Sequence, residues 1–273
     1  MSIRARTMAL CIAFIAAGST LSDPHILQPP SYDCKKAVGA ITVDGILDEE
    51  SWKRADPINL SYPHMAAKSI QPPAGVARMC WEDTNLYIGI EIPDVNIQAR
   101  GRERDAVGEE SPNDLVEIFL DINGDDNHFF EFHVNPLGGF TDIFLVLGEP
   151  GSPLNERTTY DNIFIMREFN LKVYQLAVKV YGEVNKPQPP DEKWVVELAL
   201  PFESLAMPYP ESQKNWPPWE KYRKPHPDVG DVWRVQFAVQ NYDLPKRYYV
   251  WAPTSAGFFA HNIQNFGRVR FVK

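Results

Sequence analysis

The sequence predicts an all-β protein, an antiparallel β-sandwich of the jelly-roll type with one or two short helices. Three observations support this fold class. The 273 residues include 24 prolines and 16 glycines, too many helix breakers for a protein of long helices. The hydrophobic fraction of 44% excludes an intrinsically disordered chain. The apolar segments are short, rich in β-branched or aromatic residues, and bounded by Gly, Pro, Asn or Asp.

Twelve such segments are predicted to be strands, and their number and spacing favour a sandwich or barrel. In chain order they are Ala40–Val43, Val76–Trp81, Leu86–Ile92, Leu115–Asp121, His128–Asn135, Phe140–Leu147, Ile163–Phe169, Lys172–Tyr181, Trp194–Leu200, Val232–Gln240, Tyr248–Trp251 and Arg268–Val272. The best short helix is Asp48–Ala55, because Asp48 can cap it, acidic residues open it and basic residues close it. Phe202–Leu205 is predicted to form one more helical turn. Since no low-complexity linker interrupts the strands, residues 23–273 are predicted to form one domain.

The overall charge excludes one class of partner. The formal net charge is −9, and no run of five or more Lys or Arg occurs, which argues against nucleic-acid binding. The motifs G-x-S-x-G, H-E-x-x-H, G-x-G-x-x-G and the P-loop do not occur in the sequence. A pair of glycosidase carboxylates among the 36 acidic residues remains open.

The N-terminal residues have the order of a secretory signal peptide. Arg4 and Arg6 precede the uncharged apolar run Met8–Ala17, and small residues follow it. This run is about half as long as the ~20 residues that a membrane-spanning helix needs. We therefore expect a signal peptide over residues 1–22, cut near residue 18 or 22. The mature protein would then be secreted, or periplasmic in a Gram-negative bacterium. The alternative is a buried N-terminal helix.

Removal of the signal peptide would leave two of the three cysteines. In an oxidising compartment, Cys34 and Cys80 are predicted to form one disulfide. Such a bridge would close a loop of about 45 residues, which the chain-entropy estimate values at roughly 4 kcal/mol. The alternative is two buried free thiols.

Five stretches of the sequence carry a family resemblance. They are Val43–Glu49 (V-D-G-I-L-D-E) with Trp52; Cys80–Asp83 (C-W-E-D) with Leu86–Ile88; Asp114–Asp121 (D-L-V-E-I-F-L-D) with Phe129–Pro136 (F-F-E-F-H-V-N-P); Trp194–Phe202 (W-V-V-E-L-A-L-P-F); and Gly230–Val235 (G-D-V-W-R-V) with Trp251–Thr254, His261 and Phe266–Gly267. In this order they resemble carbohydrate-binding module family 9 and its relatives among the DOMON-like β-sandwiches. The resemblance covers Ala40 to Lys273. It implies a β-sandwich that binds glycan and that is often attached to a glycoside hydrolase.

The ligand site is where the sequence departs from this family. The family's sugar-binding members hold a sugar ring between two tryptophans, whereas this chain has Ser111 and Ala260 at the matching positions. The polar partners are kept: Glu117 and Asn135 match positions that hydrogen-bond sugar hydroxyls, and His133 stands where a basic residue sits. Strand alternation also puts His133 and Asn135 on one side together with Glu131. The alternative is a solvated or internally hydrogen-bonded sheet face.

Other aromatic residues could replace the missing tryptophans. Phe258 and Phe259 adjoin Ala260, and Trp219 lies in the Pro-rich segment 207–230. Aromatic faces pack on the C–H surface of sugars, so these three residues are candidates for the apolar side of a glycan site. The alternative is that they cover an edge of the sandwich.

The acidic turn after the strand Leu115–Asp121 is a candidate calcium site. Asp121, Asn123, Asp125 and Asn127 place oxygen atoms at alternate positions. The twelfth position of the helix-loop-helix calcium motif is Phe132, so that motif is excluded, although relatives of the family do hold structural calcium. The alternative is a polar hairpin turn.

The combined reading is a secreted, monomeric, non-catalytic protein that binds an oligo- or polysaccharide, without a membrane span and with no cofactor beyond a possible structural Ca²⁺. One alternative is a glycan-active hydrolase or an accessory protein in carbohydrate catabolism. A second is a haem-binding redox module, for which Met65 or Met79 with a histidine would serve. A third is a protein-binding surface module, because both clamp tryptophans are missing.

Overall fold

A computed structural model describes residues 28–63, 66, 68–105, 107, 113–125, 128–147, 163–166, 169–206, 225–254 and 263–273. The predicted signal peptide lies outside these residues. Within them, no helix has the length and apolar character needed to cross a membrane.

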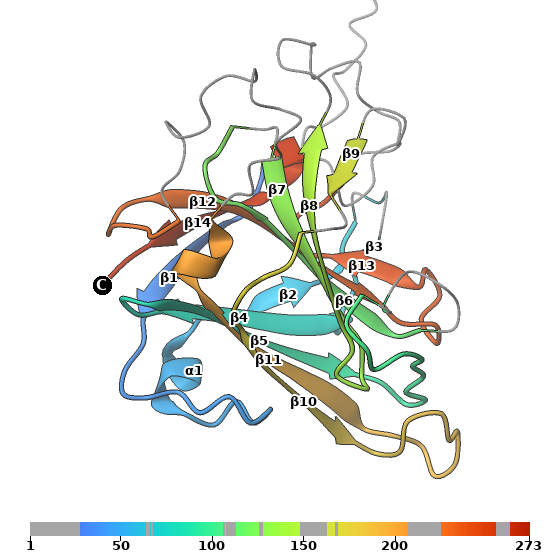
Figure 1. The fold of residues 1–273 in the computed structure, drawn as a ribbon. Coiled ribbons are helices and arrows are strands. Elements are labelled where there is room, and N and C mark those ends of the chain that lie inside the picture. Colours follow the sequence, from blue (N-terminus) through green and yellow to red (C-terminus); the bar gives the residue numbers. More distant parts are fainter. Residues whose placement is uncertain are drawn as a thin grey trace, which may run out of the picture.

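The described strands form one continuous curled sheet that folds into two facing layers (Figure 1). Sheet A has the strand order β14-β12-β6-β7-β8-β9, with β13 beside β12 and β3 beside β13. Sheet B has the order β10-β11-β5-β4, with β2 beside β4. The strands are β1 Ser31–Lys36, β2 Ile58–Leu60, β3 Tyr62–Pro63, β4 Gly75–Trp81, β5 Asn85–Pro93, β6 Leu115–Asp121, β7 His128–Val134, β8 Phe140–Leu147, β9 Ile163–Met166, β10 Gln175–Tyr181, β11 Lys193–Pro201, β12 Val232–Gln240, β13 Tyr248–Val250 and β14 Gly267–Phe271. The predicted all-β sandwich is therefore confirmed.

Strand β1 joins the two layers and is the exception to the antiparallel pairing. Residues 31–34 pair in parallel with β14 of sheet A, and Lys35 and Lys36 pair in parallel with β4 of sheet B. The other strand pairs of the described residues are antiparallel. The sheet is thus mixed, and one short strand makes it continuous.

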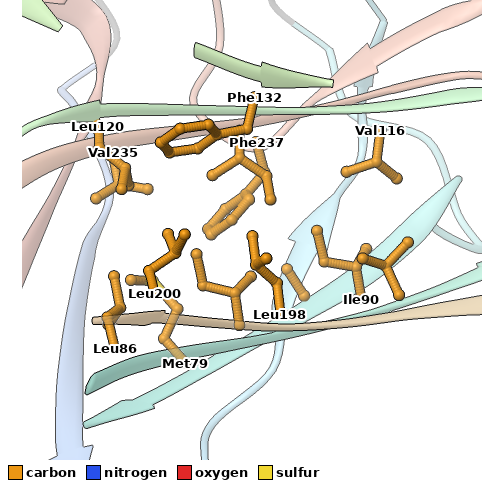
Figure 2. Close-up of a cluster of buried hydrophobic side chains, with 14 of the residues drawn as sticks. Met79, Leu86, Ile90, Val116, Leu120, Phe132, Leu198, Leu200, Val235 and Phe237 are labelled. Carbon is orange, nitrogen blue, oxygen red and sulfur yellow. The ribbon is translucent and has the colours of Figure 1, made fainter. Parts of the chain in front are cut away.

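The main hydrophobic core lies between the two layers. Figure 2 shows its centre, where side chains of the two sheets point toward one another. Sheet B contributes Met79, Leu86, Ile90, Leu198 and Leu200, and sheet A contributes Val116, Leu120, Phe132, Val235 and Phe237. Each such side chain stabilises the fold by about 1.5–3 kcal/mol through the apolar area it removes from water.

Most predicted elements occur within a few residues of their expected bounds, but β1, β2 and β3 were not predicted, and two further details were wrong. Ala40–Val43 is not a strand: Ile41 and Val43 instead pack without pairing on a small cluster around Trp52, outside sheet B. The helix α1 spans Glu50–Arg54, and its N-cap is Glu49, with no side-chain cap from the predicted Asp48. A 3₁₀ turn at Phe202–Leu205 is as predicted.

The predicted disulfide is not formed, since Cys34 and Cys80 are both free and buried. The strand register explains why. Lys35 is the residue paired with Cys80, so Cys34 and Cys80 are one position out of step and point to opposite faces of sheet B. Cys34 lies in the core between the layers, and Cys80 lies in the cluster around Trp52. Two side chains on opposite faces of a sheet cannot be bridged.

Candidate functional site

The outer face of sheet A, turned away from the main core, carries the predicted ligand residues on its central strands. Glu117 of β6 is directly opposite His133 of β7, Thr141 of β8 is opposite His133, and Ala238 of β12 is opposite Glu117. Alternation places Glu131 on the same face, two residues before His133. The sequence prediction that these side chains share one sheet face agrees with this register.

Glu117 is completely buried, and its carboxylate accepts a hydrogen bond from the hydroxyl of Tyr248. Tyr248 belongs to β13 and pairs with Gln240 of β12, so its ring must cross β12 to reach β6. The residue of β12 opposite Glu117 is Ala238, whose methyl group leaves room for this crossing. Tyr248 is only partly buried and is therefore a site residue that lies between Glu117 and the surface.

Glu131 and His133 form the second polar pair of this face. His133 Nε2 lies 2.5 Å from Glu131 Oε1, and the two residues are 7% and 2% exposed. The two side chains are thus joined by a hydrogen bond within this sheet face. Together with Glu117, they give the face two carboxyl groups and an imidazole on neighbouring strands.

Asn135 does not belong to this polar group in the way the sequence predicts. Its Nδ2 donates to the carbonyl oxygens of Arg100 (2.8 Å) and Gly101 (2.9 Å). Its Oδ1 accepts from the backbone N–H groups of Leu137 (3.0 Å) and Gly139 (2.9 Å). These four bonds use the full capacity of a side-chain amide. The predicted ligand role of Asn135 is therefore corrected to a structural one, because no donor or acceptor is left for a sugar hydroxyl.

The acidic turn after β6 is held together by its own side chains. Asp121 Oδ1 accepts from the N–H groups of Asn123 (3.2 Å) and Gly124 (2.7 Å), and Asn123 Nδ2 donates to Asp125 (2.8 Å). Asp125 in turn contacts His128 Nδ1 at 2.6 Å. Burial, assisted by the charge of Asp125, raises the pKa of Asp121 to about 7. This geometry matches the hairpin alternative.

The calcium prediction includes one residue that the structure does not describe. Its fourth residue, Asn127, lies outside the described residues. Within the described ranges, no three His, Cys, Asp or Glu side chains are grouped so as to hold a metal ion. Calcium at this turn therefore remains a prediction.

The aromatic residues predicted for the site lie outside the part of the chain that the structure describes. Trp219, Phe258 and Phe259 lie outside the described residues, as do Ser111 and Ala260. The structure does show an apolar cluster on the same outer face, formed by Phe119, Phe129, Ile143, Leu145, Ala238, Val250, Ile263 and Phe266. Tyr62 and Tyr248 are partly buried at its margin. The two tyrosines are thus aromatic residues on this face that are not fully buried.

Of the two methionines considered as haem ligands, the structure describes one. Met79 is completely buried in the hydrophobic core between the sheets (Figure 2). Met65 lies outside the described residues. The position of Met79 does not support a haem ligand.

The opening motif of the resemblance lies on the far side of the molecule, beneath sheet B in Figure 1. Glu197 of β11 accepts hydrogen bonds from the N–H groups of Asp44 (2.9 Å) and Gly45 (2.8 Å) and from Trp52 Nε1 (3.1 Å). Gly45 has a positive φ of +83°, and a Cβ there would lie 2.9 Å from the Cβ of Lys179. These residues dock the N-terminal segment on sheet B and take no part in the candidate site.

Comparison with known proteins gives one matching family. The family described as "Carbohydrate family 9 binding domain-like" matches residues 43–136, a range that includes Glu117, Glu131 and His133. No curated protein matches the chain.

Solved structures with a similar fold include proteins of Caldicellulosiruptor kristjanssonii and Bacteroides uniformis. Two are a carbohydrate-binding module family 9 of Caldicellulosiruptor kristjanssonii, in complex with cellotriose and with glucose. Each is 16% identical with a TM-score of 0.50, covering 88% of this chain and 93% or 95% of that chain. A Bacteroides uniformis protein, provisionally described as carbohydrate-binding, is 15% identical with a TM-score of 0.61 over 89% of this chain and 100% of its own. At these identities the likeness establishes the fold.

Proposed function

We propose, from the premise that residues 43–136 carry a carbohydrate-binding module family 9-like domain, that this protein binds a glycan on the outer face of sheet A. The observation that carries the proposal is the position of the matched residues. The family match contains β6 and β7, and these two strands present Glu117, Glu131 and His133 on one face.

The chemistry of this face suits hydroxyl recognition. Carboxylates are strong acceptors for hydroxyl donors, and an imidazole can donate or accept. Glu117 is held by a phenol hydroxyl, which is the same kind of donor as a sugar hydroxyl. A sugar hydroxyl can therefore replace Tyr248 at Glu117, or join it there, at little cost in unsatisfied polar groups.

The apolar side of the ligand needs an aromatic surface. Tyr62 and Tyr248 lie at the margin of the same face, and Phe258, Phe259 and Trp219 remain the candidates from the sequence. We assign the protein a non-catalytic binding role outside the cytoplasm, following the apolar N-terminal run Met8–Ala17.

The direct test is titration calorimetry with cellotriose and with glucose, preceded by a glycan array to widen the choice of ligand. The informative variant is Glu117→Gln, which keeps the shape of the side chain and removes its charge. The matched control is Glu91→Gln, the same substitution on the outer face of sheet B, where Glu91 forms a surface ion pair with Lys193 at 2.7 Å.

We expect wild type and Glu91→Gln to bind the same glycan with equal affinity and Glu117→Gln to bind at least about tenfold more weakly. The proposal is rejected if no glycan binds at millimolar concentration, with or without calcium. Release of reducing sugar from the ligand would instead indicate a hydrolase.

A further inference from the structure

The first part of the connection between β5 and β6 is held by side chains, both from the connection itself and from the segment before β11. Five consecutive N–H groups, those of residues 96–100, each donate to a different side chain. Their acceptors are Asp94 (3.0 Å), Asp191 (2.8 Å), Asp114 (2.6 Å), Asn185 (3.0 Å) and Asn113 (2.8 Å). Because most of these acceptors are carboxylates, the conformation of this segment depends on their charge.

Two of these carboxyl groups touch each other. Asp94 directly follows β5, Asp114 directly precedes β6, and their side chains are hydrogen-bonded to one another. Asp94 and Asp114 are 3% and 1% exposed. Two carboxyl groups can make a hydrogen bond only when one of them carries a proton.

The bonding of the individual oxygens differs between the two carboxyl groups. Both oxygens of Asp114 accept backbone N–H groups, from Gln98 (2.6 Å) and Tyr242 (3.2 Å), as an ionised carboxylate does. In Asp94, Oδ1 accepts the N–H of Asn96, whereas buried Oδ2 accepts no hydrogen bond from the described residues. Oδ2 of Asp94 is thus the oxygen of this pair that has room to carry a proton.

We propose that Asp94 and Asp114 share one proton and form a pH-sensitive restraint on the β5–β6 connection. When the pair is singly protonated, it binds the connection to the β12–β13 turn through Tyr242. When the proton leaves, two adjacent buried carboxylates repel each other and the restraint weakens.

The surrounding charges add to this effect. Asp243 of the β12–β13 turn faces both carboxyl groups and is itself acidic. Asp191, which precedes β11, holds the N–H of Ile97 on the other side. Burial and then the charge of Asp114 raise the pKa of Asp94 to about 7, and burial raises the pKa of Asp114 to about 6.

The direction of the pH effect follows from linkage. An Asp whose pKa is higher in the folded than in the unfolded protein binds more protons when folded, so its stabilising effect is largest at acid pH. For Asp94 this effect falls as the pH rises from about 4 to about 7, and then stays constant.

The restrained segment leads toward the candidate site. Asn135 holds the carbonyl groups of Arg100 and Gly101. Farther along, the Val107 N–H donates to Thr141 Oγ1 at 3.2 Å, and Thr141 is opposite His133. Loosening at Asp94 would therefore reach a neighbour of His133. The proposal concerns the segment itself and does not depend on glycan binding.

The test compares wild type with Asp94→Asn, whose amide can donate permanently to Asp114 while its oxygen still accepts from Asn96. Denaturant unfolding is measured at about pH 5 and about pH 8. In wild type we expect the unfolding equilibrium constant to be larger at about pH 8 than at about pH 5. In Asp94→Asn the ratio of these two constants should be at least about tenfold smaller than in wild type, because one pKa unit corresponds to a factor of ten. Amide protection factors at Asn96, Gln98 and Tyr242 should fall from acid to basic pH in wild type only.

Asp191→Asn is the matched control. Asp191 holds the same segment, but its hydrogen bonds within the described residues come from backbone N–H groups, so the substitution should weaken the fold by a similar factor at both pH values. Equal pH slopes for wild type and Asp94→Asn would overturn the proposal. So would a rise in wild-type stability at pH 8 with calcium that Asp94→Asn abolishes, because the pair would then hold a cation in place of a proton.

Discussion

Each layer of the sandwich buries a glutamate on its outer side, and the two are held by different kinds of partner. Glu197 on sheet B accepts two backbone N–H groups and the Trp52 indole, all from one docked segment. Glu117 on sheet A accepts the hydroxyl of Tyr248, from a partly exposed side chain on another strand. A backbone N–H cannot leave without moving the chain, whereas a tyrosine hydroxyl can swing away. The same residue type is therefore structural on one face and available for exchange on the other.

The largest expected effect tests the structural side of this comparison. Glu197→Ala leaves the indole N–H of Trp52 and the N–H groups of Asp44 and Gly45 without their acceptor. The donors of Gly45 and Trp52 are buried. With about 1–3 kcal/mol for each unsatisfied buried donor, we expect a loss of at least about 2 kcal/mol in the free energy of unfolding. Denaturant unfolding measures this loss. If the loss is under about 1 kcal/mol, the docked segment does not depend on Glu197.

Asn135→Ala tests whether Asn135 stabilises the fold and does not bind the ligand. It removes four hydrogen bonds within the sheet A connections, and we expect a loss of about 2–4 kcal/mol in stability. Glycan affinity measured on the folded fraction should stay within about twofold of wild type. Unchanged stability together with lost binding would return Asn135 to the ligand site.

Tyr248→Phe sharpens the comparison on the exchangeable side. Because it removes one hydroxyl donor, the expected loss is about 1 kcal/mol in stability. Because the hydroxyl that contacts Glu117 is then missing, glycan affinity should change while the ring is kept; calorimetry against wild type measures the change. The control is Tyr249→Phe, next along β13, whose side chain is in the main core. Identical affinities for all three proteins would mean that Tyr248 does not face the ligand.

The smallest expected effect concerns the two cysteines. Since Cys34 and Cys80 are free and lie on opposite faces of sheet B, adding a thiol reductant should leave the midpoint of thermal unfolding unchanged. Thiol titration in denaturant should find both of these thiols reactive. A reductant-dependent fall of several degrees would indicate a disulfide after all.

Strand alternation was enough to predict much of the fold and part of the site. β6, β8 and β12 match their predicted bounds because each is a long apolar run between turn residues. The shared face of Glu117 and His133 also follows from alternation and pairing. In contrast, β1 was missed because S-Y-D-C-K-K contains few apolar residues, although Tyr32 and Cys34 do alternate inward.

The remaining features depend on contacts far apart in the sequence. Tyr248 and Glu117 are 131 residues apart, and their contact requires the small Ala238 on the strand between them. The bonds of Asn135 reach back 34 and 35 residues to Gly101 and Arg100. The failure of the disulfide depends on a register shift of a single residue. None of these can be read from local pattern, because each requires the strand order first.

Strand β1 also constrains the order in which the chain can assemble. Its Asp33 contacts Arg270 of β14, 237 residues later. During synthesis, residues 31–34 therefore remain without their sheet A partner until almost the whole described chain has been made. Contacts of such long sequence separation slow folding. The two layers can begin to pair separately, and the strand made first is among the last to be enclosed.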